Sequence, residues 1–344
     1  MLVSDRFSQQ LRDELPYALT HVQVQELREG QTVSQCFLVR GKVHRVTRNG
    51  DPYLEITLAD RTGTIPARAW SDATLRYGND FEHGDFVFVE GRTESYRGVL
   101  QVNVSSIRRI DLHESEQGKI RDFDVALLTP TTEHDIDDMW NEFHRLADDV
   151  APPSLSRLVV GLLDENEDAF RKFPAAISFH HAYIGGLLEH SLEVARGASE
   201  YAKTCPILHR GLVTAGAILH DIGKIREMSR PASPKFTFDG QMFGHLLLGR
   251  DMVRDHAAKI GFGDSRLTEL LEHIIISHHG EREFGAAELP KTAEAMAVYY
   301  FDNLSARLNM VHNQRSTDGN ASEFTDWQDR PLGRALFKGE IPDE

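Results

Sequence analysis

Three polar side chains interrupt an apolar stretch near the middle of the chain. Residues 215–228 read AGAILHDIGKIREM, and the residues around His220, Asp221 and Lys224 would suit a buried helical face. Burying such groups is costly unless they are paired or bind a metal ion. Any fold of this chain must therefore supply these three side chains with partners inside the protein.

Other apolar, helix-like segments contain polar residues of the same kind. These residues are His190, His245, the adjacent pair His278 and His279, and Asp302. Ten of the 17 histidines fall in the range 180–279. One such residue by itself would usually be a satisfied core or surface group, but five separate segments indicate a shared site. Imidazole and carboxylate ligands suit first-row divalent ions such as Mn, Fe, Co, Ni or Zn.

The adjacent pair His220 and Asp221 suggests how two ions could be arranged. A carboxylate can bridge two ions a few Å apart, and such a pair activates water and holds the oxygens of a phosphoester. A zinc finger is excluded because the only cysteines, Cys36 and Cys205, are far apart. The sequence also has no GxSxG elbow, Walker P-loop or HExxH motif. Metal-dependent phosphoester chemistry fits these patterns best.

Residues 35–110 have a different pattern, in which five short strands alternate apolar and polar residues between Gly- and Asp-rich turns. Five strands in this length predict a small closed β-barrel of the OB type, which commonly binds single-stranded nucleic acid on one face. A barrel that serves only assembly is the alternative. Candidate phosphate contacts are Arg40, Lys42, Arg45, Arg68, Arg92 and Arg97. Candidate stacking residues are Tyr53 and Tyr96, whereas Trp70, at a strand end, is expected in the core.

The predicted organisation places an all-α domain after the barrel. We expect an N-terminal extension at 1–30, the OB domain at 31–112, a linker with one helix at 113–152, the helical domain at 153–314 and a tail at 315–344. Within the helical domain, periodicity predicts helices at 154–164, 184–202, 209–226, 242–260, 265–277 and 291–311.

Charge is distributed unevenly along the chain. The net charge is -15, but residues 34–110 carry 11 Lys+Arg against 9 Asp+Glu, which makes that segment +2 and the remainder -17. The negative remainder should disfavour tight non-specific binding to duplexes, while the barrel supplies local positive charge for a single strand. It has no apolar run of about 18 residues and no basic-then-apolar leader. With only two cysteines, a cytoplasmic protein without membrane partners is expected.

The order of His190, His220–Asp221 and Asp302 on helices resembles the HD superfamily of metal-dependent phosphohydrolases. The 30-residue spacing between GGLLEHS and HDIGK supports the resemblance. It implies that the first ion is held by His190, His220, Asp221 and Asp302. It also implies that Asp221, His245 and His278, with His279, hold a second ion. Lys224 would neutralise the phosphate or help to protonate the leaving oxygen, with an ordinary surface lysine as the alternative.

Nearly the whole chain, from about residue 25 to 312, is similar to the YhaM-type 3′–5′ exoribonucleases. The segments FPAAISFHHAYIGGLLEHSLEVA, ILHDIGK, GHLLLG and SHHGE carry this resemblance. It implies trimming of single-stranded RNA, and sometimes single-stranded DNA, with Mn2+ as the typical metal, release of nucleoside 5′-monophosphates, and a homo-oligomer. His180 and His181 would line the substrate path, and His181 is expected to act with Asp221 and Lys224. A loop-to-helix junction without a catalytic role is the alternative for these two histidines.

Two other functions compete with this one. An HD-type enzyme acting on small nucleotides would not need the barrel for turnover. A non-catalytic single-stranded nucleic-acid-binding factor would bind an oligonucleotide in EDTA and never shorten it.

Overall fold

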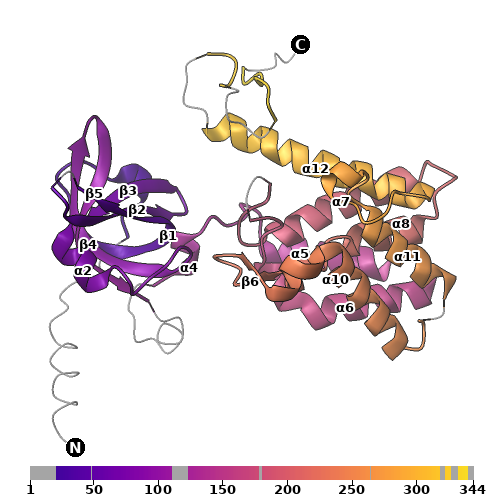
Figure 1. The fold of residues 1–344 in the computed structure, drawn as a ribbon. Helices are drawn as coiled ribbons and strands as arrows, with labels where there is room; N and C mark the ends of the chain where they lie inside the picture. Colours follow the sequence, from indigo (N-terminus) through magenta and orange to yellow (C-terminus); the bar gives the residue numbers. More distant parts are fainter. Residues whose placement is uncertain are drawn as a thin grey trace, which may run out of the picture. The chain divides into compact units, whose positions relative to one another are not determined.

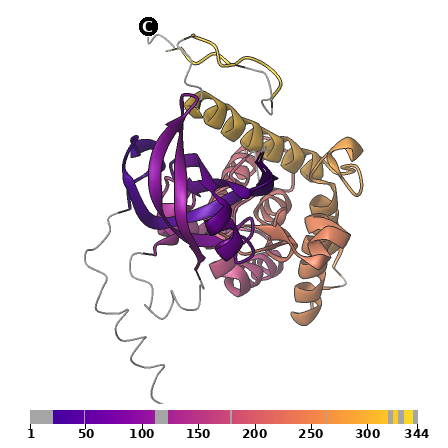
Figure 2. The same ribbon diagram turned by 60° about the vertical axis from the view of Figure 1, so that its left-hand side comes forward.

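The computed structural model describes residues 21–47, 49–110, 123–177, 180–263, 265–317, 322–326 and 332–339. The chain divides into two compact units, Met1–Pro130 and Thr131–Glu344. Figures 1 and 2 show the first as a sheet structure in indigo and purple and the second as a set of helices in magenta to yellow. The predicted extension up to residue 20 and the connection at 111–122 lie outside the described residues. The predicted domain limits stay predictions.

The first unit is a closed five-stranded barrel with the strand order β1-β2-β3-β5-β4. Its strands are β1 (Thr32–Val46), β2 (Pro52–Asp60), β3 (Gly63–Ala69), β4 (Phe86–Tyr96) and β5 (Val99–Arg109). The pair β3–β5 is parallel and the other pairs are antiparallel. Short helices η1 (Val24–Glu26), α2 (Ser71–Tyr77) and α4 (Val125–Leu128) accompany them. The predicted OB-type barrel is confirmed.

Strand alternation decides which side chains fill the barrel. Leu54, Ile56 and Leu58 of β2 are buried, since every second residue of a strand points to the same face. In β3 the small residues Ala67 and Ala69 point inward in the same way. The next residue, Trp70, therefore points outward and is 41% exposed. The expectation that Trp70 lies in the core is wrong, because the strand period continues through the residue that precedes α2.

The second unit is helical. Its helices are α5 (Ile136–Asp148), α6 (Pro153–Lys172), α7 (Gly186–Ala202), α8 (Arg210–Leu219), α9 (Lys224–Glu227), α10 (Phe238–Lys259), α11 (Arg266–Ser277), η2 (Arg282–Phe284) and α12 (Ala293–Thr317). A hairpin of two short strands, β6 (Met228–Ser229) and β7 (Lys235–Phe236), precedes α10. Helix α5, expected within a linker, packs in this unit against α6 and α7. Within the described residues, none of the helices is both long enough and apolar enough to cross a membrane.

Two of the predicted helices are shaped differently in the structure. The stretch 209–226, expected as one helix, ends at Leu219 and resumes at Lys224. The intervening turn is tight, with Lys224 N–H donating to Asp221 O at 3.0 Å. Helix α10 starts at Phe238, earlier than the expected residue 242, and is kinked at Gly244, whose φ of 67° is non-helical. Both departures lie next to predicted site residues. The end of α8 precedes His220 and Asp221, and the kink in α10 precedes His245.

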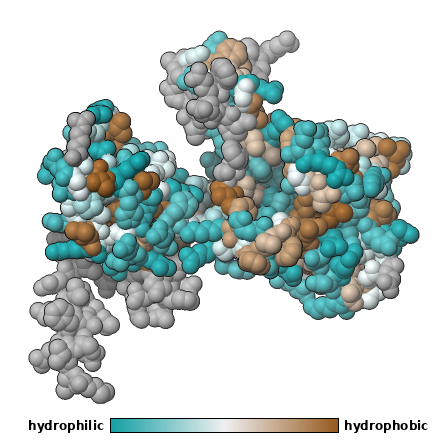
Figure 3. All heavy atoms as spheres, in the orientation of Figure 1, coloured by the Kyte–Doolittle hydropathy of each residue, from teal (hydrophilic) through white to brown (hydrophobic). Residues whose placement is uncertain are grey.

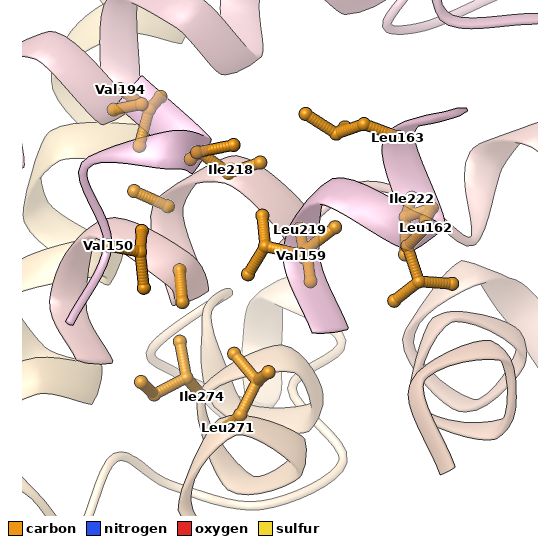
Figure 4. Close-up of a cluster of buried hydrophobic side chains, with 14 of the residues drawn as sticks. Val150, Val159, Leu162, Leu163, Val194, Ile218, Leu219, Ile222, Leu271 and Ile274 are labelled. Atoms are coloured by element: carbon orange, nitrogen blue, oxygen red, sulfur yellow. The ribbon is translucent and has the colours of Figure 1, made fainter. Parts of the chain in front are cut away.

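Helix α8 is the centre of the helical core. Every residue from Gly211 to Leu219 is buried, so this helix has neighbours on all sides. Figure 4 shows Ile218 and Leu219 of α8 among side chains of α6, α7 and α11. A helix that is apolar all round is stable only in such a position. The core thereby fixes the point at which α8 ends, and His220 and Asp221 follow directly.

Glycine allows α8 to approach α11 closely. A Cβ atom added at Gly216 would lie 2.7 Å from Cγ2 and 2.9 Å from Cδ1 of Ile274. Contacts under 3 Å force one of the helices to shift, and overpacking a core generally costs stability.

We therefore expect Gly216→Ala to lower the free energy of unfolding by about 1–2 kcal/mol, although alanine is the better helix former. The same substitution in an Ile274→Ala background should be neutral or stabilising, because the obstructing atoms are then gone. Urea unfolding of the four proteins measures both effects. Equal costs in the two backgrounds would show that the close approach is not the cause.

Candidate metal centre and nucleic-acid interface

The polar residues singled out in the sequence come together from five helical segments, most of them at a helix end or a kink. His190 lies in α7, while His220 and Asp221 follow the last residue of α8. His245 comes directly after the kink in α10, and Asp302 lies in α12. His278 and His279 follow the end of α11. His190 and Asp302 thus project from within helices, and the other side chains reach the same place from helix ends and from the kink.

One group of ligand atoms is formed by His190, His220, Asp221 and Asp302. The Nε2 atom of His190 is 3.1 Å from Oδ1 of Asp302 and 3.5 Å from Oδ2 of Asp221. The Nε2 atoms of His190 and His220 are 3.2 Å apart. His220 Nε2 is also 3.4 Å from Asp221 Oδ2. His190, His220 and Asp221 are almost completely buried, so these atoms face one another and not solvent.

A second group of ligand atoms contains His245, His278 and His279. The Nε2 atoms of His245 and His279 are 3.2 Å apart. The other carboxylate oxygen of Asp221, Oδ1, lies 3.6 Å from Nε2 of His245 and 3.5 Å from Nε2 of His278. The two oxygens of Asp221 thus face different groups. This is the arrangement that a bridging carboxylate requires.

Hydrogen bonds at the opposite ring nitrogen fix the orientation of all five imidazoles. His220, His278 and His279 donate Nδ1–H to the carbonyl oxygens of Ala217, Ile275 and Phe284, His245 donates to Glu227 Oε1, and His190 donates to Ser305 Oγ, at 2.8–3.0 Å. Carbonyl and carboxylate oxygens can only accept. The Ser305 hydroxyl donates in turn to Glu193 Oε2 at 2.6 Å, so it accepts from His190. A neutral imidazole held in this way presents an Nε2 lone pair to the cluster.

These lone pairs fit metal ions. Two unprotonated nitrogens 3.2 Å apart cannot hydrogen-bond to each other, and this occurs both at His190–His220 and at His245–His279. Asp221 Oδ1 is buried and has no hydrogen-bond partner among the residues that the structure describes. Ligands at about 2.1 Å from one ion lie roughly 3.0–3.4 Å apart in octahedral or tetrahedral geometry. The spacing and donor types are therefore those of a site for divalent ions.

The ionisation of these groups suits metal binding as well. Burial lowers the pKa of His190 to about 4, and burial together with His278 lowers that of His279 to about 3, so both are neutral at pH 7. Burial opposes ionisation of Asp221, but Lys224 and His220 hold its pKa well below the usual value. His220 differs: burial would lower its pKa, but the carboxylates of Asp221 and Asp302 outweigh burial and raise it.

Lys224 and the histidine pair before α7 lie beside the cluster. Lys224 is buried, and its Nζ is 2.5 Å from Asp221 Oδ2, so it is not a surface lysine. The ring of His181 is fully buried 5.2 Å from that of His190, and its predicted catalytic role stays a prediction. His180 is half-buried, and burial with the nearby charge of Lys224 lowers its pKa to about 3. Gly186 makes this junction possible, because a Cβ there would lie 2.1 Å from His181 O.

Three supporting residues were missed in the sequence. Ser305 and Glu193 hold His190 through the hydrogen bonds given above, and Glu227 accepts from both the backbone and the ring of His245 at 3.0 Å. Ser305 lies three residues after Asp302, on the same side of α12, which is a spacing that could have identified it. Glu193 has the same relation to His190. Glu227 gave no such signal in the sequence, because it lies 18 residues before His245 and the β6–β7 hairpin brings the two together.

The barrel residues predicted to contact phosphates differ in their availability. Lys42 donates to Phe81 O at 2.6 Å and pairs with Glu82 at 3.0 Å, and its side chain is 4% exposed. Arg40 is half-buried, and burial lowers its pKa. Arg45 is exposed and paired with Glu55 at 3.0 Å. The geometry favours Arg45 over Lys42 as a residue within reach of an outside phosphate.

Aromatic and basic side chains gather on the outside of the barrel. The rings of Tyr53 and Trp70 are 5.4 Å apart. The guanidinium groups of Arg68 and Arg97 lie over the ring of Tyr96 at 4.6 Å and 5.3 Å from its centre. Tyr96 and Trp70 are 45% and 41% exposed. Exposed rings with adjacent cations are the groups on which the bases of a single strand stack.

Comparison with protein families matches both units. Residues 187–307 match the HD domain family, and residues 37–110 match a family described as an OB-fold nucleic acid binding domain. A third family, TraI_2, whose description concerns a helicase, matches residues 124–211.

Three curated relatives, each called 3′-5′ exoribonuclease YhaM, are similar over most of their length. The protein of Geobacillus sp. (strain WCH70) is 31% identical over 282 residues, which cover 82% of this chain and 84% of the relative. That of Bacillus subtilis (strain 168) is 32% identical over 282 residues, or 82% and 87%. That of Halalkalibacterium halodurans is 30% identical over 297 residues, or 86% and 90%. Matches of this length include residues of both compact units.

The hydrogen bond from His190 to Ser305 makes a testable contribution to this centre. We expect Ser305→Ala to weaken divalent-metal binding by about 10–100-fold, because His190 loses the partner that fixes its tautomer. Metal content after dialysis, measured by mass spectrometry, and the melting temperature without metal separate this effect from misfolding. Ser316→Ala, at an exposed serine of the same helix, is the control. Unchanged metal content in Ser305→Ala would contradict the assignment.

Proposed function

The chain belongs to the YhaM-type 3′–5′ exoribonucleases, and on this premise we propose that it shortens single-stranded RNA from the 3′ end by hydrolysis at the histidine–aspartate cluster. The observation that carries the proposal is the set of five imidazole Nε2 atoms and two carboxylates facing one another inside the HD domain. Such a donor set has no evident structural purpose without a cation, because it places lone pairs against lone pairs.

Two divalent ions would be held by this cluster. His190, His220 and Asp302 with Oδ2 of Asp221 would bind the first, and His245, His278 and His279 with Oδ1 of Asp221 the second. Ions at such a site polarise a phosphodiester and lower the pKa of water. Mn2+ is the proposed metal, and Fe, Co, Ni and Zn accept the same kind of ligands.

The residues of the chain have separate tasks in this reaction. Water attacks the phosphorus of the last phosphodiester and loses a proton to the solvent, and the bond to the 3′ oxygen of the preceding nucleotide breaks. The terminal nucleotide leaves as a nucleoside 5′-monophosphate. Lys224, whose ammonium lies 2.5 Å from Asp221, would neutralise the phosphate and supply a proton to the leaving oxygen. His181 would support this site from its position against His190.

The barrel would hold the single strand. Tyr53, Trp70 and Tyr96 offer exposed or half-exposed rings, and Arg68 and Arg45 add positive charge on the same barrel. Stacking on rings is tolerant of sequence, since every base has a π-face. This tolerance suits an enzyme that must accept each nucleotide in turn. Single-stranded DNA would also be a substrate if no residue of the protein hydrogen-bonds to the 2′-hydroxyl of RNA.

The direct test is a time course with 5′-labelled single-stranded RNA on a sequencing gel, with Mn2+ and with EDTA. A Mn2+-dependent ladder that shortens from the 3′ end is expected. RNA that stays intact under both conditions would point to a small-nucleotide hydrolase or a binding factor, and phosphate release from a panel of nucleotides would then separate these two.

Replacing the bridging carboxylate should abolish turnover. We expect Asp221→Ala to lower the rate of RNA shortening by at least about 10³-fold, since both ions lose a ligand and each contributes several kcal/mol of charge stabilisation. Metal content should fall as well, while RNA affinity in EDTA stays within about twofold because the barrel is untouched. Asp255→Ala, at an exposed aspartate of α10, is the control. Retained activity in Asp221→Ala would refute the two-ion proposal.

The exposed ring pair on the barrel should contribute to RNA affinity. Base–aromatic stacking is worth about 1–3 kcal/mol per base, so we expect Trp70→Ala to weaken RNA binding about 5–150-fold. Fluorescence anisotropy in EDTA measures binding without turnover. The control is Leu75→Ala, at a side chain of the same unit that is 76% exposed. Equal affinities in the two variants would show that the pair does not contact RNA.

A further inference from the structure

The segment between Arg226 and Phe243 exposes apolar side chains next to the metal centre. Four of them stand out in the described part of this unit: Phe236 at 47%, Phe238 at 78%, Met242 at 61% and Phe243 at 54% exposed. They belong to β7 and the first turns of α10. Figure 3 shows hydrophobic residues gathered on the side of the helical unit where Figure 1 labels β6. Exposed aromatic side chains in this density indicate a binding surface.

The same segment is basic within an acidic chain. Residues 226–243 contain three Lys or Arg and two Asp or Glu, a net charge of +1, whereas the whole chain carries -15. Arg226, Arg230 and Lys235 are exposed. Aromatic rings interleaved with cations match the needs of a single-stranded nucleic acid, which offers bases to stack and phosphates to neutralise. A purely apolar protein partner would not require the positive charge.

Hydrogen bonds attach this segment to the metal centre through Glu227. The Thr237 N–H at the start of α10 donates to Glu227 O at 2.9 Å. Gly240 packs against the same carbonyl so closely that a Cβ would lie 2.2 Å from it. The Glu227 carboxylate accepts from the N–H and the ring of His245 at 3.0 Å. The exposed ring of Phe243 and the cluster-facing ring of His245 are thus separated only by the kink at Gly244.

We propose that Phe236, Phe238 and Phe243 with Arg226, Arg230 and Lys235 form a subsite for the last nucleotides of single-stranded RNA. The phenylalanines stack on bases and the cations contact the flanking phosphates, beside the atoms that hydrolyse the terminal bond. This inference rests on the proposed function and adds to it a second RNA contact that belongs to the helical unit. The subsite is tolerant of sequence, because none of its aromatic residues offers a hydrogen bond to a base edge.

The test uses the full-length chain, with RNA oligonucleotides that differ only at the 3′ end. One ends in ordinary nucleotides and the other carries abasic residues at its last two positions. For the wild type, KM for the ordinary oligonucleotide should be about tenfold or more below that for the abasic one, from the usual strength of base stacking. Phe238→Ala/Phe243→Ala should raise KM for the ordinary oligonucleotide by a similar factor and leave KM for the abasic one nearly unchanged.

Controls separate this subsite from the rest of the mechanism. Tyr201→Ala, at a ring of α7 that is 53% exposed, should not change KM for either oligonucleotide. The metal content of the double variant should equal that of the wild type, which would show an intact centre. If the wild type does not shorten RNA, the proposed function fails. If it does, but the double variant discriminates against abasic ends as the wild type does, the subsite is refuted. A double variant with unchanged KM but a smaller mass by light scattering would instead assign the surface to a second copy of the chain.

Discussion

The structure of the helical unit depends on one buried carboxylate. Asp221 has Lys224 and two histidines beside one oxygen and two further histidines beside the other. An anion so enclosed is tolerated only with compensating charge. Lys224 of α9 supplies positive charge next to one oxygen. The imidazoles that surround the carboxylate come from α7, α10 and the ends of α8 and α11, so elements distant in sequence converge on one residue. The position of Asp221 also depends on α8. This helix is buried along its length, and Asp221 lies two residues after its last residue, Leu219.

Much of this arrangement was predictable from the sequence, and the reason is the same carboxylate. Charged residues inside apolar helical segments must find each other, so His190, His220, Asp221, His245, His278, His279 and Asp302 were predicted together and lie together. The barrel was predicted from strand alternation. Local shape was harder to foresee: the turn that interrupts 209–226 and the kink at Gly244 both include a glycine, but a glycine in a helical pattern does not by itself say that the helix breaks there. Trp70 was misjudged for a related reason, since the end of a strand leaves the facing direction of a side chain to the tertiary structure.

The two units differ in how far they expose their charged and polar side chains to solvent. The barrel places rings and guanidinium groups on its exposed outer surface. The helical unit buries His190, His220, Asp221 and His278 almost completely, which strengthens the electrostatic contacts among them. An exonuclease that removes one nucleotide at a time needs both properties: reversible binding of the strand and precise positioning of the bond that breaks.

The orientation of the five imidazoles has a consequence for the stability of the protein in the cell. Nitrogens held with their lone pairs face to face repel each other, and the surrounding hydrogen bonds keep them from turning away. A cation placed between these nitrogens would remove that repulsion, so metal binding would add to the stability of the folded protein. A cell short of the right metal would hold a less stable protein that is more readily degraded, so the supply of the ion would govern the amount of enzyme as well as its rate.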